Sequence, residues 1–138
     1  MYFGLSDERK LLQATLREFA AKELPPTRLR RIFDEGSGFD AALWRAAAAV
    51  GIPGLAVPER SGGAGQELLD LALAFEVLGE AALPGPFLGH ALASLTLLLG
   101  GSDAQRERVA KLAGSSNIQH NVIGERGLGL PRDLRPGR

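Results

Sequence analysis

The sequence predicts an all-α fold, an irregular up-and-down bundle of about five helices with a weakly ordered C-terminal tail. Its 138 residues include 20 Ala and 24 Leu but only 5 Val and 4 Ile. Side chains without a branch at Cβ lose little rotamer freedom in a helix, whereas β-branched side chains favour strands. In addition, clusters of Gly and Pro divide the chain into stretches whose apolar residues recur at helical spacing. A chain of this length can bury a core without disulfides.

Charge and cysteine content exclude several kinds of function. The 16 Lys and Arg residues balance the 16 Asp and Glu residues, so the chain lacks the basic excess that nucleic-acid binders use to contact phosphates. It has no cysteine, which excludes disulfides and thiolate metal sites. No secretory signal pattern follows the first residue. We therefore expect a cytoplasmic protein without a metal site.

The first predicted helix covers about residues 6–24. Ser6 is a suitable N-cap, and the two acidic residues that follow it suit the positive end of the helix dipole. One face repeats apolar side chains at helical spacing, namely Leu12, Leu16 and Phe19. Pro25 and Pro26 end this helix. Residues 27–35 then form either a short helix or an ordered connection.

The second predicted helix covers residues 41–50, with Asp40 as its N-cap and Gly51 as the residue that ends it. Its alanine run makes it a thin helix that its neighbours can approach closely. Residues 52–65 are rich in Gly and Pro and predict an ordered loop, anchored by two apolar side chains, Leu55 and Val57.

Three further helices are predicted, over residues 66–82, 87–99 and 103–113. The middle one is apolar nearly all round, so we expect it to be the central and most buried helix. It is too short for a membrane span, because its thirteen residues reach about 20 Å against a hydrocarbon core of about 30 Å. Ser102 is the expected cap of the last helix.

The chain divides by charge into two parts. Residues 1–114 carry 12 basic and 14 acidic side chains, a net charge of −2, and form the predicted helical domain. Residues 115–138 carry 4 Arg, one Glu and one Asp, a net charge of +2, with a high content of Gly and Pro. Such a composition lacks the apolar periodicity of a packed segment, so we expect a weakly ordered tail.

Two short patterns allow a phosphate-binding interpretation, and for both we favour a structural one. Residues 62–65, Gly-Gly-Ala-Gly, precede a helix, and a helix N-terminus can hold phosphate. They lack the third glycine and the preceding strand of a dinucleotide fingerprint, which favours a turn. Arg28, Arg30 and Arg31 are followed within a turn by two acidic residues, which favours a solvated face over a phosphate clamp.

Two titratable side chains lie among apolar neighbours. Glu76 is a candidate catalytic base, but sequence neighbours on a helix point about 100° apart, so we favour a carboxylate that faces solvent or caps a neighbour. His90 is a candidate polar contact in a substrate cavity, and we favour a hydrogen-bonded core histidine. The other histidine, His120, belongs to no metal-binding pattern, so no metal ligand is assigned.

Four groups of segments carry a resemblance to a known family: 3–8 with 19–25, 39–44 with 50–59, 61–65 with 75–79, and 83–87 with 101–106. In this order and spacing they resemble the N-terminal helical domain of the flavin-dependent acyl-CoA dehydrogenases. The resemblance covers residues 3–114. It implies an oxidoreductase of fatty acid and lipid metabolism that carries out α,β-dehydrogenation of acyl-CoA thioesters, with FAD as the hydride acceptor.

The resemblance also implies which parts of such an enzyme lie elsewhere. In the family, a middle β domain and a C-terminal helical bundle hold most of the flavin, and the catalytic base is usually a Glu of the C-terminal part. The strand that opens the β domain ends in Thr-Glu or Ser-Glu, and the nearest match here is Glu125, which Gly124 precedes. No catalytic or cofactor-binding residue is therefore assigned. We expect the chain alone to be a truncated, non-catalytic form that meets acyl-CoA and FAD only with the missing domains, as a homo- or hetero-oligomer.

The third and fourth predicted helices resemble those that border the acyl chain in the family. Four residues near the start of the fourth helix are therefore candidates for one wall of the acyl pocket: Phe87, Leu88, Ala91 and Leu92. Plain core positions are an equally open interpretation of these residues. The alternative function is a non-catalytic helical interaction module that pairs with a separate flavoprotein chain or with itself, because an uncovered apolar wall favours a partner.

Overall fold

The computed structural model of this protein describes residues 4–113, with side chains as far as Val109. These residues form only helices, turns and loops, in the order α1 (Asp7–Glu23), α2 (Pro26–Asp34), α3 (Ala41–Ala49), η1 (Ile52–Gly54), η2 (Glu59–Ser61), α4 (Leu68–Glu80), α5 (Phe87–Gly100) and α6 (Asp103–Ala113), where η marks a short 3₁₀ turn. The all-α prediction is confirmed, and the residues left open between helix and connection form α2. The predicted tail, residues 115–138, lies outside the described residues.

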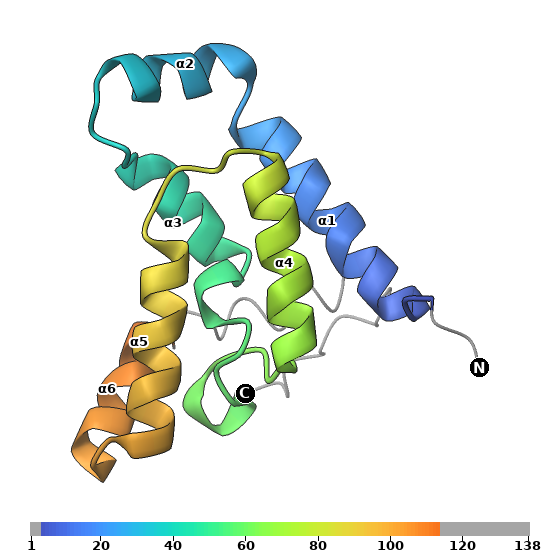
Figure 1. Cartoon of the computed structure of the whole chain (residues 1–138). Coiled ribbons are helices and arrows are strands. Elements are labelled where there is room, and N and C mark those ends of the chain that lie inside the picture. The colour runs from blue at the N-terminus through green and yellow to red at the C-terminus, as the bar shows by residue number, and fades with distance from the viewer. Residues whose placement is uncertain (1–3, 114–138) are drawn as a thin grey trace, which may run out of the picture.

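The helices form an up-and-down bundle in which α4 lies between α1 and α5 (Figure 1). α2 lies across one end of this bundle, and the loop between α3 and α4 folds at the other end. α1 and α4 pack closely along their length, while α6 packs on α5 and on η2. The bundle is irregular because α2 crosses its end instead of running along it.

The main core fills the space between α1, α3, α4 and α5. Its buried members come from all four helices and the loop after α3: Leu16, Ala47, Ile52, Leu55, Leu71, Ala74, Val77, Leu78, Phe87 and Ala91. A smaller cluster lies against α2 and consists of Leu24, Ile32 and Leu43. A third contact, between Val57 and Val109, holds α6 against the loop. The two predicted loop anchors, Leu55 and Val57, are thus both buried.

The prediction that residues 87–99 form the most buried helix is wrong. α5 turns only its Phe87 and Ala91 side into the main core. A row of its leucines is exposed to 59%, 56% and 83%, namely Leu88, Leu92 and Leu99. A helix that is apolar all round is usually buried on every side, which is why the sequence predicted a central helix here. However, no described element covers this side of α5. α4 is the more buried helix, because neighbours flank it on both sides.

A ladder of polar contacts runs along the edge between α1 and α4. Three side chains of α1 donate to carboxylates of α4 at 2.7, 3.0 and 3.1 Å: Arg9 to Asp70, Gln13 to Glu76, and Arg17 to Glu80. The contacts advance in the same direction on both helices, so α1 and α4 run parallel. Asp70, which is buried, also accepts the backbone N–H of Glu67 at 3.0 Å and so closes the first turn of α4.

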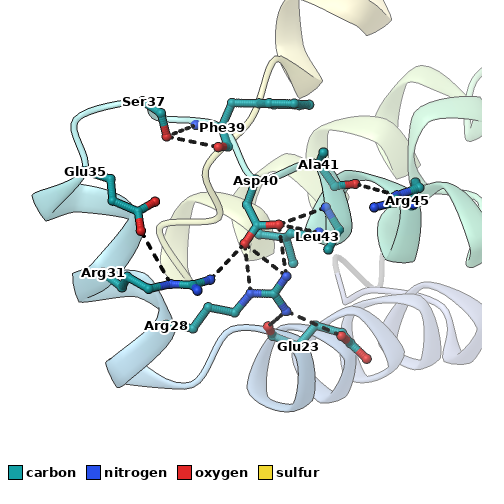
Figure 2. A network of polar contacts seen from close by, with 11 residues as sticks. Glu23, Arg28, Arg31, Glu35, Ser37, Phe39, Asp40, Ala41, Leu43 and Arg45 are labelled. Atoms are coloured by element: carbon teal, nitrogen blue, oxygen red, sulfur yellow. Dashed lines mark hydrogen bonds and ion pairs between the residues drawn. The ribbon is translucent and has the colours of Figure 1, made fainter.

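Asp40 joins three helices at one end of the bundle (Figure 2). Its Oδ1 accepts hydrogen bonds from the backbone N–H groups of Ala42 and Leu43, at 2.9 and 3.0 Å, which caps α3 as predicted. The Arg28 guanidinium, on α2, donates to Oδ2 of Asp40 from Nε at 3.2 Å and from Nη2 at 3.1 Å. Its Nη1 donates to the carbonyl oxygen of Glu23, at the end of α1, at 2.7 Å.

The surroundings of Asp40 favour its ionised form. The Leu43 N–H, followed by the Arg28 guanidinium and the Ala42 N–H, outweighs burial and lowers the pKa of Asp40 below its ordinary value. A carboxyl whose pKa falls on folding stabilises the fold at neutral pH, and this contribution is lost as the pH drops below about 4. The charge of Asp40 therefore stabilises the fold in addition to the hydrogen bonds with which this side chain caps α3.

Replacing Asp40 with Ala should lower the free energy of unfolding by about 2 kcal/mol, because α3 loses its N-cap and Arg28 loses its partner. Asp40→Asn keeps a capping oxygen and removes only the charge, so it should lower stability less. Urea unfolding of both variants beside the wild type measures the two contributions. If Asp40→Ala is as stable as the wild type, the role given to Asp40 is wrong.

Candidate functional site

The four predicted pocket residues lie on two sides of α5. Phe87 and Ala91 are 6% and 8% exposed and belong to the main core. Leu88 and Leu92 point away from that core and are more than half exposed. Residues four apart on a helix share a face, which is why these side chains separate into two pairs. The pocket wall itself stays a prediction.

Leu99 extends the exposed pair into a longer apolar surface. Positions 88, 92 and 99 turn to the same side of a helix, and we call Leu88, Leu92 and Leu99 the α5 stripe. Thr96 adds no free polar group beside this stripe, because its hydroxyl donates to the Leu92 carbonyl oxygen at 2.8 Å. Leu99 is not among the predicted pocket residues, although the helical spacing of these leucines is a signal that identifies it.

Three aromatic contacts converge on Trp44 beneath the start of α5. The ring centroid of Trp44 lies 5.0 Å from that of Phe87, 5.5 Å from that of His90 and 6.5 Å from that of Phe39. The His90 ring meets Trp44 edge-on, and partial burial lowers the pKa of His90 because it disfavours the imidazolium. Within the described part of the chain its imidazole has a ring contact instead of the predicted hydrogen bond.

The glycine-rich residues 62–65 form a structural turn, as predicted. Their four backbone N–H groups donate to carbonyl oxygens of the same loop at 2.8, 3.2, 3.0 and 2.8 Å: Gly62 to Glu59, Gly63 to Pro58, Ala64 to Gly54, and Gly65 to Val57. Because these N–H groups are used inside the loop, they do not form a phosphate cradle. Gly63 is needed for space, since a Cβ there would overlap the carbonyl oxygen of Val57.

The charged candidates make contacts within the chain. Arg28 pairs with Asp40, and Arg31 reaches the same carboxylate at 3.4 Å. Glu76 is exposed and accepts a hydrogen bond from Gln13 at 3.0 Å. These contacts fit a paired, solvated interpretation better than a phosphate clamp or a catalytic base.

The described residues offer no cluster of metal-ligating side chains. In residues 4–113, no group of three or more His, Cys, Asp or Glu could hold a metal ion. A hollow of about 310 Å³ lies between α1 and α3, at the lower end of the range of ligand pockets, which span about 300–1,000 Å³. Over the same residues, every helix is too short or too polar to cross a bilayer.

Together, the fold and this surface define an all-α domain that is open on one side, along the α5 stripe. The chain belongs to the family of the acyl-CoA dehydrogenase N-terminal domain, whose sequence model matches residues 6–114. The family as a whole comprises FAD-dependent oxidoreductases, so the resemblance found from the four groups of segments is confirmed.

Several curated relatives agree with this family. Acyl-CoA dehydrogenase IpdE2 of Mycolicibacterium smegmatis is 37% identical over 118 residues, which cover 85% of this chain and 38% of that protein. IpdE2 of Mycobacterium tuberculosis is 41% identical over 119 residues, or 85% and 37% of the two chains. Benzylmalonyl-CoA dehydrogenase of Aromatoleum aromaticum is 34% identical over 98 residues, or 71% and 25%. The chain thus spans less than two-fifths of these relatives, and no solved structure matches it significantly.

Gly63→Ala should lower the free energy of unfolding by about 2 kcal/mol, because the loop must open to admit the methyl group. Gly79→Ala is the matched control. Gly79 lies within α4, a Cβ there meets nothing within 4 Å, and alanine is the better helix former, so this change should stabilise by about 0.5–1 kcal/mol. Thermal and urea unfolding of both variants check the pair, and equal effects would argue against the close approach at Gly63.

The stability of the chain should fall as the pH drops through about 6.5, because the unfolded chain then protonates His90 more readily than the folded one does. Urea unfolding at about pH 7.5 and 5.5 measures this loss. His90→Gln removes the titrating ring and should therefore reduce this loss. The same loss in the wild type and in His90→Gln would exclude His90 as its source.

Proposed function

We propose that residues 4–113 act as the N-terminal helical domain of an FAD-dependent acyl-CoA dehydrogenase and supply one wall of the pocket for the acyl chain of a CoA thioester. The complete enzyme removes the α-proton and passes a β-hydride to the flavin. The observation that carries the proposal is the α5 stripe, an uncovered apolar row on a domain of this family.

An acyl chain suits the α5 stripe because both are apolar and elongated. From Leu88 to Leu99 the helix rises about 16 Å. Burying one exposed leucine side chain contributes about 1.5–3 kcal/mol of favourable free energy. Three leucines in a row therefore strongly favour contact with an apolar ligand or a neighbouring domain. The satisfied Thr96 hydroxyl adds no polar group that would have to be desolvated.

The four candidate residues then have two roles. Leu88 and Leu92 contact the acyl chain, since they are exposed on the stripe. Phe87 and Ala91 act from beneath, because they fasten α5 to the core and Phe87 packs on Trp44. The wall excludes water and orients the substrate, while the flavin and the base come from other parts of the enzyme.

By this proposal the chain on its own does not catalyse the reaction. It works in the cytoplasm, beside the parts that hold FAD, within a homo- or hetero-oligomer. The supporting observation is that the family model matched by residues 6–114 is that of the N-terminal domain, and that the match covers 38% of IpdE2 of Mycolicibacterium smegmatis. The α5 stripe also suits the alternative arrangement, in which this chain is a helical module that pairs through the same leucines with a separate flavoprotein chain or with a second copy of itself.

A chimera tests the proposed wall. Residues 4–113 replace the matching segment of IpdE2 from Mycolicibacterium smegmatis, and flavin content and acyl-CoA-dependent reduction of a dye are measured. The chimera should bind flavin and turn over. Leu92→Trp in it should lower kcat/KM for the bulkiest accepted acyl group about ten-fold relative to the smallest, because the larger ring fills the pocket. Phe33→Trp, at an exposed position of α2, should leave this ratio unchanged.

The two parts of the proposal fail separately in this experiment. A folded chimera without flavin or turnover would contradict the domain assignment, and an active one whose substrate ratio ignores Leu92→Trp would contradict the wall. The 138-residue chain itself, mixed with FAD and acyl-CoA, should elute without yellow flavin and give no turnover. Sustained turnover with bound flavin would refute its non-catalytic role. Co-elution with the flavin-binding portion of IpdE2, made as a separate chain, would favour the alternative module.

A further inference from the structure

We propose that two copies of this chain pair through the exposed face of α5, with the two helices antiparallel. The second copy is the partner because this face is complementary to itself in shape and carries no charge. The pairing deepens the alternative arrangement, in which the chain is a module that pairs with itself, and it rests on that arrangement instead of on the acyl wall.

The exposed face of α5 alternates small and large side chains along one line. Four exposed residues follow one another there at spacings of three, four and three residues, and we call them the α5 seam: Gly89, Leu92, Thr96 and Leu99. Helices that pack side by side meet at this spacing. A Cβ on Gly89 would meet nothing within 4 Å, so the seam has room there for a side chain of another molecule. The Thr96 hydroxyl already donates to the Leu92 carbonyl oxygen and needs no further partner.

A two-fold axis between antiparallel helices sets each leucine of the seam against a small residue. When this axis lies level with Ser94, Leu92 of one copy lies opposite Thr96 of the second copy. The same rotation sets Leu99 opposite Gly89. A parallel pair would instead set leucine against leucine and glycine against glycine, which crowds one layer and leaves the next one empty. Close packing therefore favours the antiparallel pair, in which each layer of the seam holds one large and one small side chain.

Electrostatics do not oppose this pairing. Residues 81–102 include no Asp, Glu, Lys or Arg, so the two seams meet without like charges. The formal net charge of the chain is 0 at pH 7, which removes the longer-range repulsion between copies of a charged protein. A helix face of 14 residues, about 21 Å long and about 10 Å wide, covers less than the roughly 800 Å² that each partner buries in a standard interface. The pair is therefore weak, with a Kd on the order of 100 µM.

Sedimentation velocity of the 138-residue chain tests the pairing. Between about 5 µM and about 500 µM, the mean mass should rise from that of a monomer towards that of a dimer. Leu92→Glu places a carboxylate in the seam and should raise the Kd at least about ten-fold, because that charge would be buried without a partner. Leu68→Glu makes the same change at an exposed leucine of α4 and should leave the Kd as it is.

Filling a small position of the seam separates shape from general apolar attraction. Gly89→Leu adds apolar surface, yet it should raise the Kd about ten-fold, because the new side chain collides with Leu99 of the second copy. Adding Leu99→Ala makes room again and should return the Kd to within about three-fold of the wild type. Gly79→Leu, at an exposed glycine of α4 where a Cβ also meets nothing within 4 Å, is the matched control and should change nothing. Circular dichroism shows whether each variant is folded.

Cross-linking measures the orientation of the two helices. The chain has no cysteine, so Gly89→Cys and Leu99→Cys each introduce a single thiol. When the two variants are mixed and oxidised, disulfides should join one variant to the other, because positions 89 and 99 lie opposite each other in the antiparallel pair. A parallel pair would join each variant to its own kind.

A chain that stays monomeric at about 500 µM would refute the pairing, and so would an equal effect of Leu92→Glu and Leu68→Glu. A tighter dimer in Gly89→Leu, or cross-links mainly within each variant, would refute the antiparallel seam. None of these measurements involves flavin or acyl-CoA. A monomeric chain beside an active chimera would therefore exclude the pairing and leave the domain assignment in place.

Discussion

The ion pair between Asp40 and Arg28 fastens α2 to the start of α3 at one end of the bundle. Apolar contact alone gives little direction, and the cluster against α2 has only three buried members: Leu24, Ile32 and Leu43. A guanidinium that meets a carboxylate through two nitrogens adds geometry to that contact. Because the same carboxylate caps α3, it also sets where α3 begins. Trp44, one turn later, packs on Phe87 at the start of α5, with ring centroids 5.0 Å apart.

The buried side and the exposed side of α5 both follow from the way in which this helix packs on the core. Once Phe87 and Ala91 enter the core, helical spacing turns Leu88 and Leu92 outward, and no separate contact is needed to aim them. The ladder between α1 and α4 holds the opposite edge of the bundle with charge-assisted hydrogen bonds. The domain is thus stabilised by its apolar core and by the polar contacts at its edges, while α5, its most apolar helix, keeps one side uncovered.

Local sequence signals predicted where the helices begin and end better than they predicted what each helix packs against. Asp40 and Gly51 identified the ends of α3 because a capping oxygen and a left-handed φ of 89° are needed at those positions whatever packs nearby. The sequence left residues 27–35 undecided between a helix and a connection, because Pro25 provides no side-chain cap and Ile32 is the one buried residue of α2. Exposure of α5, the ring contact of His90 and the hollow depend on distances between helices, which a sequence pattern does not contain.

The connection from α2 to α3 has a different character from the rest of the domain. Gly36 and Gly38 adopt φ values of 67° and 59°, and a Cβ on either would meet nothing within 4 Å. Between them, the Ser37 hydroxyl bonds only to the nearby Phe39 backbone. Both glycines are favoured by their left-handed φ, but nothing packs against them, so residues 36–38 connect α2 to α3 without contributing to the core. A reporter peptide or a cleavage site inserted there would sit away from both the α5 stripe and the hollow, which makes it the natural handle for labelling this domain.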